Sequence, residues 1–507
     1  MEAAAQFIQE IVSQIEPIEL RANNAWWRQA TTGSEEAGQE MQEAKLALAK
    51  IFSSAKEYQR LLECPPSDDP QIQRQVKLLK DAFREHQIPE ELLEEMVQLE
   101  VSIEADYTNF RASLEGKEVS NNALKEIFLK SNSSLERQAA WEASKRIGEI
   151  VEKKVLQLVS LRNKAARLVG YCDFYTMRLE LQELDERRLF EILEQLEKVS
   201  LPIWNKYKQE LDSELALRFN ISQDELEPWH YPDPFFQEAP RGKVDLDAYY
   251  KGKDVVGISR NYYASLNLPV DDILERSDLF EREKKSQHAF CMTLDRKQDV
   301  RILCNLRDNS YWMATQLHEL GHAVYDKYID PSLPYLLRTY AHISTTEAIA
   351  MLFGRMNSNP SFVLQFCGVE PSQELSFETS AALLVFARWV LVMTHFERAM
   401  YQMSESDLSL FWWECVGNYQ GVKCPEGRHK PDWASKLHLA CAPVYYQNYL
   451  LGEMTASQLL RHLGERPGDY LKEKLFKLGA QYTWEETLLR ATGECLNPTY
   501  FTQDIER

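Results

Sequence analysis

Apolar and charged residues alternate at helical spacing through residues 1 to about 200. The segments EELLEEMVQLEVSIEADYTNF (90–110) and FEILEQLEKVSLPIWNKYKQEL (190–211) place apolar side chains three and four positions apart. This spacing gathers the apolar side chains on one face of a helix. The first third of the chain is therefore predicted to consist mainly of long helices.

The helical pattern is interrupted between Glu227 and Val244. The run EPWHYPDPFFQEAPRGKV is rich in proline and aromatic residues, and proline disfavours helix both at its own position and at the residue before it. After it come a helical pattern in VGISRNYYASLNL, a predicted strand at Asp299–Leu306, and further long helices. We expect a mainly α-helical protein with one small antiparallel sheet.

Composition supports a folded, helix-rich protein. Of 507 residues, 44% are hydrophobic and 27% charged, while glycine and proline number only 19 and 20. Scarce turn residues and abundant helix formers agree with the pattern. The net charge of −20 is spread along the chain, so binding to nucleic acid through a basic surface is not expected.

The chain start and the cysteines bear on the compartment. The first residues, MEAAAQFIQEIVSQIEP, form an amphipathic pattern without a basic leader, and we see no run of about 20 apolar residues of the kind that spans a membrane. Nine cysteines are scattered without CxxC spacing. These features predict a cytoplasmic protein with free thiols that does not bind a membrane.

The segment MATQLHELGHAVYDKY carries the clearest chemical signal. His318, Glu319 and His322 form an HExxH arrangement within a helical pattern. Four residues on a helix bring both imidazoles to one face, where they can bind one zinc ion. Glu319 then reaches a water at the metal, and Gly321 leaves room beneath the pair. A pair of surface histidines is the alternative interpretation.

Glu347 is the candidate third ligand. It follows Ser344, Thr345 and Thr346 at the start of a second apolar helical segment, ISTTEAIAMLFGRM. A carboxylate in a first helical turn is also stabilised by the helix dipole alone, but we favour the ligand interpretation. Two histidines and one glutamate leave one position open for water, which is the catalytic pattern of zinc. Glu319 is then the predicted general base for amide hydrolysis.

A second cluster of polar side chains lies in ASKLHLACAPVYYQNYLLGE. Within fourteen residues this segment holds Lys436, His438, Tyr445, Tyr446 and Tyr449. Such donors can stabilise an oxyanion. Tyrosines spaced by three and four residues are equally typical of ordinary helix packing, so the residues alone leave both interpretations open.

Several separated segments together resemble the angiotensin-converting enzyme family of zinc peptidyl-dipeptidases, in particular its single-domain bacterial-type members. HELGH with Glu347 matches the metal site of that family. His288 and Ala289 match a substrate-binding His-Ala pair thirty residues before the first zinc histidine. KLH and YQNY match its Lys-x-His and Tyr-x-x-Tyr motifs.

The resemblance implies a role for each matching residue. Tyr449 and His438 would stabilise the oxyanion, Lys436 and Tyr446 would hold the C-terminal carboxylate of the peptide, and His288 and Ala289 would contact the substrate backbone near the scissile bond. The resemblance also implies a single peptidase domain over residues 1–507. Two lobes would flank a deep central channel, and helices within about residues 1–110 would form a lid.

The chain departs from the family pattern at four positions. Asn448 stands where the family often has a chloride-binding arginine, and Met351 replaces an aspartate that supports a zinc histidine. Gln287 replaces a cysteine, which removes one family disulfide, while Cys291 and Cys304 stay an open pair for which we favour free thiols. The interval from His438 to Tyr446 is one residue longer than in the family. Gln237 is a weaker match to a glutamine of the carboxylate pocket.

These observations predict a zinc metallopeptidase with one Zn²⁺ per chain that releases dipeptides from the C-termini of short peptides. The alternatives are a helical oligoendopeptidase or a metallocarboxypeptidase that releases single residues. A non-catalytic helical binding protein is the third interpretation. The intact set of His318, Glu319, His322, Glu347 and Tyr449 argues against it.

Overall fold

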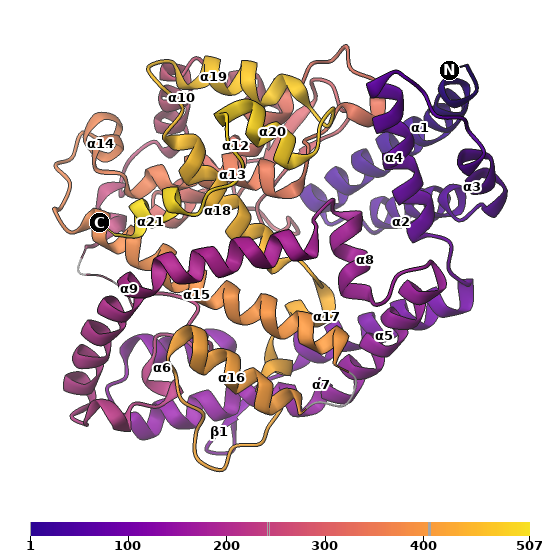
Figure 1. Ribbon diagram of the computed structural model, residues 1–507. Coiled ribbons are helices and arrows are strands. Elements are labelled where there is room, and N and C mark those ends of the chain that lie inside the picture. The colour runs from indigo at the N-terminus through magenta and orange to yellow at the C-terminus, as the bar shows by residue number, and fades with distance from the viewer. Residues whose placement is uncertain (1, 241, 243, 404–406, 507) are drawn as a thin grey trace. The chain divides into compact units, whose positions relative to one another are not determined.

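The computed structural model describes residues 2–240, 242, 244–403 and 407–506. Most of the described residues lie in α-helices, and the strands form two small antiparallel sheets (Figure 1). This confirms the mainly α-helical prediction. The chain divides into two compact units. Unit 1 comprises Met1–Gln87, Lys243–Ser376 and Leu451–Phe501, and unit 2 comprises Ile88–Gly242, Phe377–Leu450 and Thr502–Arg507.

Unit 1 holds the helices at the two ends of the chain and one of the sheets. Its elements are α1 (Glu2–Thr32), α2 (Glu35–Phe52), α3 (Ala55–Leu62), α4 (Pro70–Glu85), α10 (Val255–Ser265), α11 (Asp271–Arg276), β3 (Phe290–Thr293), β4 (Val300–Leu303), α12 (Ser310–Lys327), α13 (Ile343–Gly354), α14 (Pro360–Phe362), α19 (Pro467–Lys474) and α20 (Trp484–Thr492).

Unit 2 contains the two longest helices of the described chain. Its elements are α5 (Glu90–Asn109), β1 (Ala112–Leu114), β2 (Lys117–Val119), α6 (Asn121–Lys130), α7 (Ser134–Leu168), α8 (Phe174–Leu181), α9 (Glu186–Phe219), α16 (Leu408–Gln420) and α17 (His438–Cys441). Three helices contribute residues to both units: α15 (Leu375–Gln402), α18 (Tyr446–Leu460) and α21 (Thr499–Ile505).

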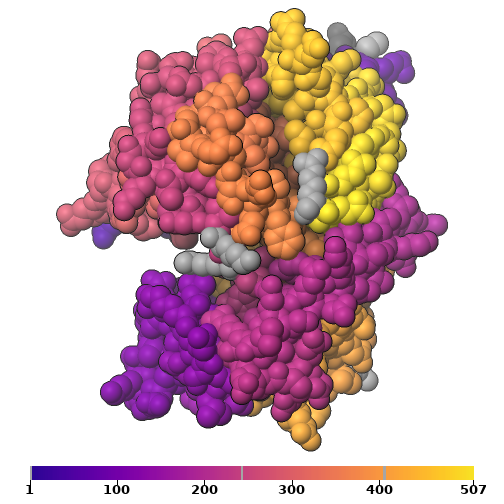
Figure 2. Space-filling view, turned by 90° about the vertical axis from the view of Figure 1, so that its left-hand side faces the viewer, coloured from indigo at the N-terminus to yellow at the C-terminus, as the bar shows by residue number. Residues whose placement is uncertain are grey.

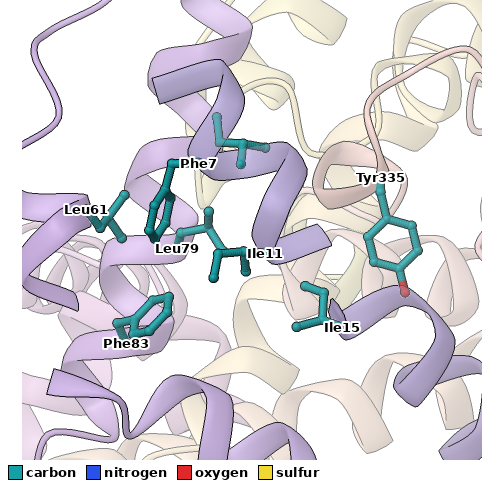
Figure 3. Packing of buried hydrophobic residues seen from close by; sticks show 8 residues of the cluster. Phe7, Ile11, Ile15, Leu61, Leu79, Phe83 and Tyr335 are labelled. Carbon is teal, nitrogen blue, oxygen red and sulfur yellow. The ribbon is translucent and has the colours of Figure 1, made fainter. Parts of the chain in front are cut away.

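Helix α1 packs against other helices of unit 1 through one apolar stripe. Phe7, Ile11 and Ile15 repeat every four residues along α1, and they meet Leu61 of α3 and a buried pair on α4 (Figure 3). The whole buried cluster is Phe7, Ile8, Ile11, Ile15, Leu61, Leu79, Phe83 and Tyr335. Burying each such side chain contributes about 1.5–3 kcal/mol. This packing explains why the amphipathic pattern of the first residues forms a helix.

The strands β3 and β4 form the small sheet that the sequence predicted. They pair antiparallel, with Phe290 opposite Leu303 and Cys291 opposite Ile302. Ring stacking at 5.0 Å between Trp26 and Phe290 attaches the end of α1 to β3. The predicted strand at Asp299–Leu306 proves shorter, since β4 covers only Val300–Leu303.

A second sheet, the hairpin of β1 and β2, was not predicted. Glu115 and Gly116 form its turn, both at positive φ (51° and 78°). Two consecutive residues at positive φ are typical of the tight turns that match strand twist.

The proline-rich segment at 227–244 is irregular, as the sequence predicted. Its described residues form one short 3-10 turn at Pro228–His230, while Arg241 and Lys243 lie outside the described residues. The chain passes from unit 2 to unit 1 at the end of this segment. The expectation that residues 1 to about 110 form a lid over a channel stays a prediction.

In unit 1 the end of the chain packs beside its middle. Asn267 donates a hydrogen bond of 2.6 Å to Asp469, and Lys472 donates one of 2.8 Å to the backbone carbonyl of Asn267. Figure 2 shows the pink segment around residue 260 and the yellow C-terminal segment on the same face of this unit.

The expectation that no segment is long and apolar enough to span a membrane needs correction, because one described helix, α15, is so by length and composition. Its apolar window has a mean hydropathy of 1.5, and 61% of that window is buried within the protein. The helix also carries two buried charged side chains, Arg388 and Glu397. Burial of this kind is typical of a core helix.

Candidate metal centre and catalytic site

Helix α12 places the HExxH residues. It begins at the cap residue Asn309, whose side-chain oxygen accepts a hydrogen bond of 2.9 Å from the backbone N–H of Trp312. Buried apolar residues such as Met313, Leu317 and Val324 fix one side of the helix in the core of unit 1. His318 and His322 remain partly exposed on another side.

Helix α13 brings Glu347 to the two histidines because α12 and α13 approach each other very closely. A Cβ atom at Gly321 would lie 2.7 Å from Cα of Ala350 and 3.0 Å from the carbonyl oxygen of Ile349. A side chain at position 321 would therefore force the helices apart. The structure confirms that Gly321 leaves room beneath the histidines.

His318, His322 and Glu347 converge on one point. Oε2 of Glu347 lies 3.6 Å from Nε2 of His318 and 3.9 Å from Nε2 of His322. The three potential ligand atoms all lie within 4.8 Å of one another. The two imidazole rings are nearly perpendicular, at 86°. This arrangement leaves a space between one carboxylate oxygen and two imidazole nitrogens.

The electrostatics of these residues favour a bound cation. Burial lowers the pKa of His318 to about 4, and burial together with the neighbouring His318 lowers the pKa of His322 well below its usual value. Both imidazoles are therefore neutral at pH 7, and each offers a lone pair. Two neutral imidazoles and one carboxylate are the donor set of catalytic zinc sites. The residues fit a zinc ion.

Glu319 occupies a buried position next to this group. Its side chain accepts a hydrogen bond from the backbone N–H of Cys291 on β3, and only 7% of the residue is exposed. Burial, and secondly the charge of Glu347, raise the pKa of Glu319 to about 8. A carboxyl group of this kind can take up a proton and release it again near neutral pH.

Two further contacts surround the ligands. Oγ1 of Thr346 lies 2.7 Å from Nδ1 of His322. Met351, which stands where the family has an aspartate, packs towards α18: a Cβ at Gly452 would lie 3.1 Å from its sulfur and 3.3 Å from Cβ of Glu347. Met351 thus fills space beside Glu347 and presents no acceptor to a histidine.

His288 and Ala289 lie immediately before β3, the strand that supplies the backbone N–H to Glu319. His288 is exposed, and its backbone N–H donates to Oγ of Ser286 at 3.3 Å. Ala289 is half-buried. Both residues thus belong to unit 1 and precede the strand next to α12.

In unit 2, Lys436 is half-buried among one polar and three aromatic side chains. Its Nζ donates a hydrogen bond of 2.7 Å to Oε1 of Gln237 and lies within 5.6 Å of the ring centres of Phe235, Trp389 and Tyr446. Burial lowers the pKa of Lys436 to about 8. The short turn before Lys436 packs against α7 at Gly148, where a Cβ would lie 2.4 Å from the carbonyl oxygen of Pro431.

Aromatic contacts connect the remaining predicted residues of unit 2. The ring of Tyr446 lies 5.0 Å from that of His438 and 5.7 Å from that of Tyr449. Burial, aided by the neighbouring Lys436, lowers the pKa of His438 to about 4, and burial raises the pKa of Tyr446. Lys436, His438, Tyr446 and Tyr449 therefore form one cluster, the Lys436 cluster.

The structure also shows the surroundings of the residues that depart from the family motifs. The side chain of Asn448 is buried and donates a hydrogen bond of 2.8 Å to Oε1 of Gln182, so it is part of the core packing. Val444, in the longer interval before Tyr446, adopts a left-handed backbone with φ 55°. The backbone N–H of Val444 donates to the buried carboxyl of Glu397 at 2.8 Å.

Gln237 is a hydrogen-bond partner of Lys436, and only a weak match to the family pattern pointed to it in the sequence. It lies 199 positions from Lys436 in the chain, and the hydrogen bond between them is visible only in the fold. The nine cysteines are all free, including Cys291 and Cys304, as the sequence predicted. Burial raises the pKa of both of these thiols.

Comparison with known proteins identifies the family. Residues 1–211 and 244–493 match the family described as angiotensin-converting enzyme, peptidase M2. A comparison with curated proteins found no match. The matched residues include the candidate metal centre and the Lys436 cluster, whereas Gln237 falls in the interval between the two matched ranges. The chain therefore belongs to the angiotensin-converting enzyme family, and it is a zinc metallopeptidase of that family.

Proposed function

We propose that this protein is a peptidyl-dipeptidase that removes dipeptides from the C-termini of short peptides. Family membership supports zinc-dependent peptide hydrolysis. The observation that carries the finer proposal is the environment of Lys436. Among the described residues, this half-buried ammonium donates a hydrogen bond to the neutral Gln237 and has three aromatic neighbours, and the charges of Asp233 and Glu238 act on it without forming an ion pair. A free carboxylate is the ligand that such a cation binds best.

Lys436 and Tyr446 are proposed to bind the C-terminal carboxylate of the peptide. The Tyr446 ring centre lies 5.6 Å from Nζ of Lys436, and its hydroxyl is proposed as a second donor to the carboxylate. Partial burial weakens solvent screening and so strengthens the charge interaction. Fixing the carboxylate selects one peptide bond for cleavage, because the distance from the carboxylate to the reacting carbonyl then sets the cut position. We assign the bond before the last two residues.

His318, His322 and Glu347 would hold the zinc ion. When bound, zinc polarises the substrate carbonyl and lowers the pKa of a water molecule towards about 7. Glu319 takes a proton from the attacking water as the water oxygen bonds to the carbonyl carbon. Glu319 then delivers this proton to the departing amine nitrogen when the peptide C–N bond breaks. The products are a shortened peptide acid and a free dipeptide.

Tyr449 and His438 are proposed to donate hydrogen bonds to the oxyanion that develops on the substrate carbonyl. Each such donor is typically worth about 3–4 kcal/mol. His288 and Ala289, just before β3, are proposed to contact the peptide backbone around the scissile bond. Their position beside the strand that binds Glu319 supports this role.

We also infer that the protein works in a reducing compartment, the cytoplasm. Nine free cysteines support this inference, because thiols persist where the environment keeps them reduced. The proposed partners are short unfolded peptides, which can present a free C-terminus to Lys436.

The test is mass spectrometry of the products from a ladder of peptides with free or amidated C-termini. We expect dipeptides from the peptides with a free C-terminus and a strong loss of cleavage from the amidated peptides. Internal cuts that ignore amidation would indicate an oligoendopeptidase, and single residues would indicate a metallocarboxypeptidase. Lys430→Ala is the matched control for Lys436→Ala, since Lys430 is an exposed lysine paired with Glu149. Only Lys436→Ala should raise KM.

A further inference from the structure

The two histidines of the metal centre differ in the hydrogen bonding of Nδ1, the ring nitrogen that does not face Glu347. Nε2 of each imidazole lies towards Glu347, so Nδ1 is the atom left to fix the ring. Nδ1 of His322 is 2.7 Å from Oγ1 of Thr346. Nδ1 of His318 makes no hydrogen bond with any residue that the structure describes. Among the described residues, the Thr346 hydroxyl is thus the hydrogen-bond partner found for the Nδ1 atoms of the two histidines.

A histidine that binds a metal through Nε2 needs its proton on Nδ1. That proton requires an acceptor, which fixes both the tautomer and the rotation of the ring. The oxygen of Thr346 is such an acceptor, and it cannot compete for the metal because it lies on the far side of the imidazole. Only 2% of Thr346 is exposed, so water does not replace it easily.

The place of Thr346 in the fold makes it a rigid support. It immediately precedes Glu347 in the buried first turns of α13, and the close packing at Gly321 fixes α13 against α12. One short segment therefore supplies a metal ligand and orients a second ligand on the neighbouring helix. Met351 offers no hydrogen-bond acceptor from the next turn.

We propose that Thr346 is the positioning residue of the metal centre: its hydroxyl accepts the Nδ1 proton of His322 and holds that imidazole ready for zinc. In this way a neutral side chain one position before Glu347 supplies the support that Met351 cannot give. His322 is the pre-oriented histidine, and His318 is fixed by the metal itself. The inference rests on the zinc centre and not on the proposed dipeptide release.

The experiment measures zinc affinity in the full-length protein by competition with a chromogenic chelator, with no peptide present. Thr346→Val keeps the shape of the side chain and removes the hydroxyl. Losing an outer-shell partner of this kind typically costs about 10–100-fold in metal affinity. We expect this loss for Thr346→Val and an affinity within about twofold of wild type for Thr346→Ser, which restores the hydroxyl.

Thr455→Val is the matched control. Thr455 is also a buried threonine in a helix of unit 1, but its hydroxyl has no hydrogen-bond partner among the described residues. Its zinc affinity should equal that of the wild type. Cobalt-substituted protein gives a second readout, because visible absorption reports ligand geometry. Its bands should change for Thr346→Val and stay unchanged for the other two variants.

Three results would overturn the inference. Thr346→Val could bind zinc as tightly as the wild type. Thr346→Ser could lose as much affinity as Thr346→Val, which would make the methyl group and not the hydroxyl responsible. Thr455→Val could lose affinity equally, which would show a general effect of removing buried hydroxyls. Circular dichroism of the metal-free variants shows whether each one is folded before zinc is added.

Discussion

At the scale of single residues, Glu319 matters most, because it is the proposed general base of peptide hydrolysis. Its side chain is buried next to the metal ligands and receives a backbone hydrogen bond from Cys291. Glu319→Gln keeps the shape and removes the proton acceptor. We expect kcat to fall by about 10²–10⁴-fold, with zinc still bound at one ion per chain. Metal analysis and steady-state kinetics on the same sample check both points. A kcat close to wild type would exclude Glu319 as the base.

Lys436 gives a prediction on pH dependence. Burial lowers the pKa of Lys436 from 10.5 to about 8, so the ammonium is present below that pH and is lost as the pH rises through it. Carboxylate binding needs the ammonium. KM for a free-acid peptide should therefore increase between pH 7 and 9.5, approaching about tenfold per pH unit at the upper end. Lys436→Met should show a high KM that does not change over this range. A flat wild-type profile would contradict the assignment.

The proposed site residues differ in how visible they are in the sequence. His318, Glu319 and His322 were predictable because a helix converts spacing of one and four residues directly into a common face. Glu347 could be proposed from its place at the start of an apolar helix. The contact between Gln237 and Lys436 joins positions 199 residues apart, and the contact between Thr346 and His322 joins two helices. Neither follows from local spacing.

At the scale of elements, the packing of α12 on α13 sets the geometry of the metal centre. Gly321→Ala would place a Cβ 2.7 Å from the backbone of Ala350, so the helices must separate. Overpacking of this kind costs about 1–3 kcal/mol, and zinc affinity should fall as Glu347 moves away from the histidines. Urea unfolding and zinc titration measure the two effects.

The control for this change is Gly417→Ala in α16. A Cβ at Gly417 would meet only the carbonyl oxygen of Val422, at 3.9 Å, and the residue is exposed. Alanine in a helix interior is favoured over glycine by about 1 kcal/mol. This variant should therefore be as stable as the wild type or more stable. If both variants lose stability equally, close helix contact is not the cause.

Elements were predictable where pattern and packing agree. The stripe of Phe7, Ile11 and Ile15 follows the helical period and forms a buried face. The hairpin at Glu115 and Gly116 escaped prediction because its strands are three residues long, too short for an alternating pattern to show. Pro17 and Pro202 lie inside long helices at exposed positions, where proline would be expected to interrupt the helix.

At the scale of the whole molecule, the metal ligands belong to one compact unit only. His318, His322 and Glu347 all lie in unit 1, whereas α7 lies entirely in unit 2. A ligand that binds the native state stabilises what it binds. Removing zinc should therefore speed amide hydrogen exchange in α12 and α13, with little change in α7. Exchange measured by mass spectrometry, with and without chelator, tests this. Equal changes in both helices and α7 would contradict a local effect.

Of the boundaries between the two units, only the one near Gly242 is marked by a change in the sequence pattern. The proline-rich run ends where unit 2 passes to unit 1 near Gly242. The boundaries near Ser376, Leu450 and Phe501 fall within helices α15, α18 and α21. A helix that contributes to two units has no change of composition at the boundary, so sequence pattern does not mark it.

The most direct test of the account is a titration of metal-free protein with zinc while peptide hydrolysis is followed. We predict no hydrolysis without zinc, a rise that ends at one equivalent of zinc per chain, and no rise in Glu319→Gln although it binds the same equivalent. Hydrolysis by the metal-free protein, or full activity of Glu319→Gln, would contradict the central claim that a His318, His322 and Glu347 zinc centre with Glu319 as base cleaves the peptide.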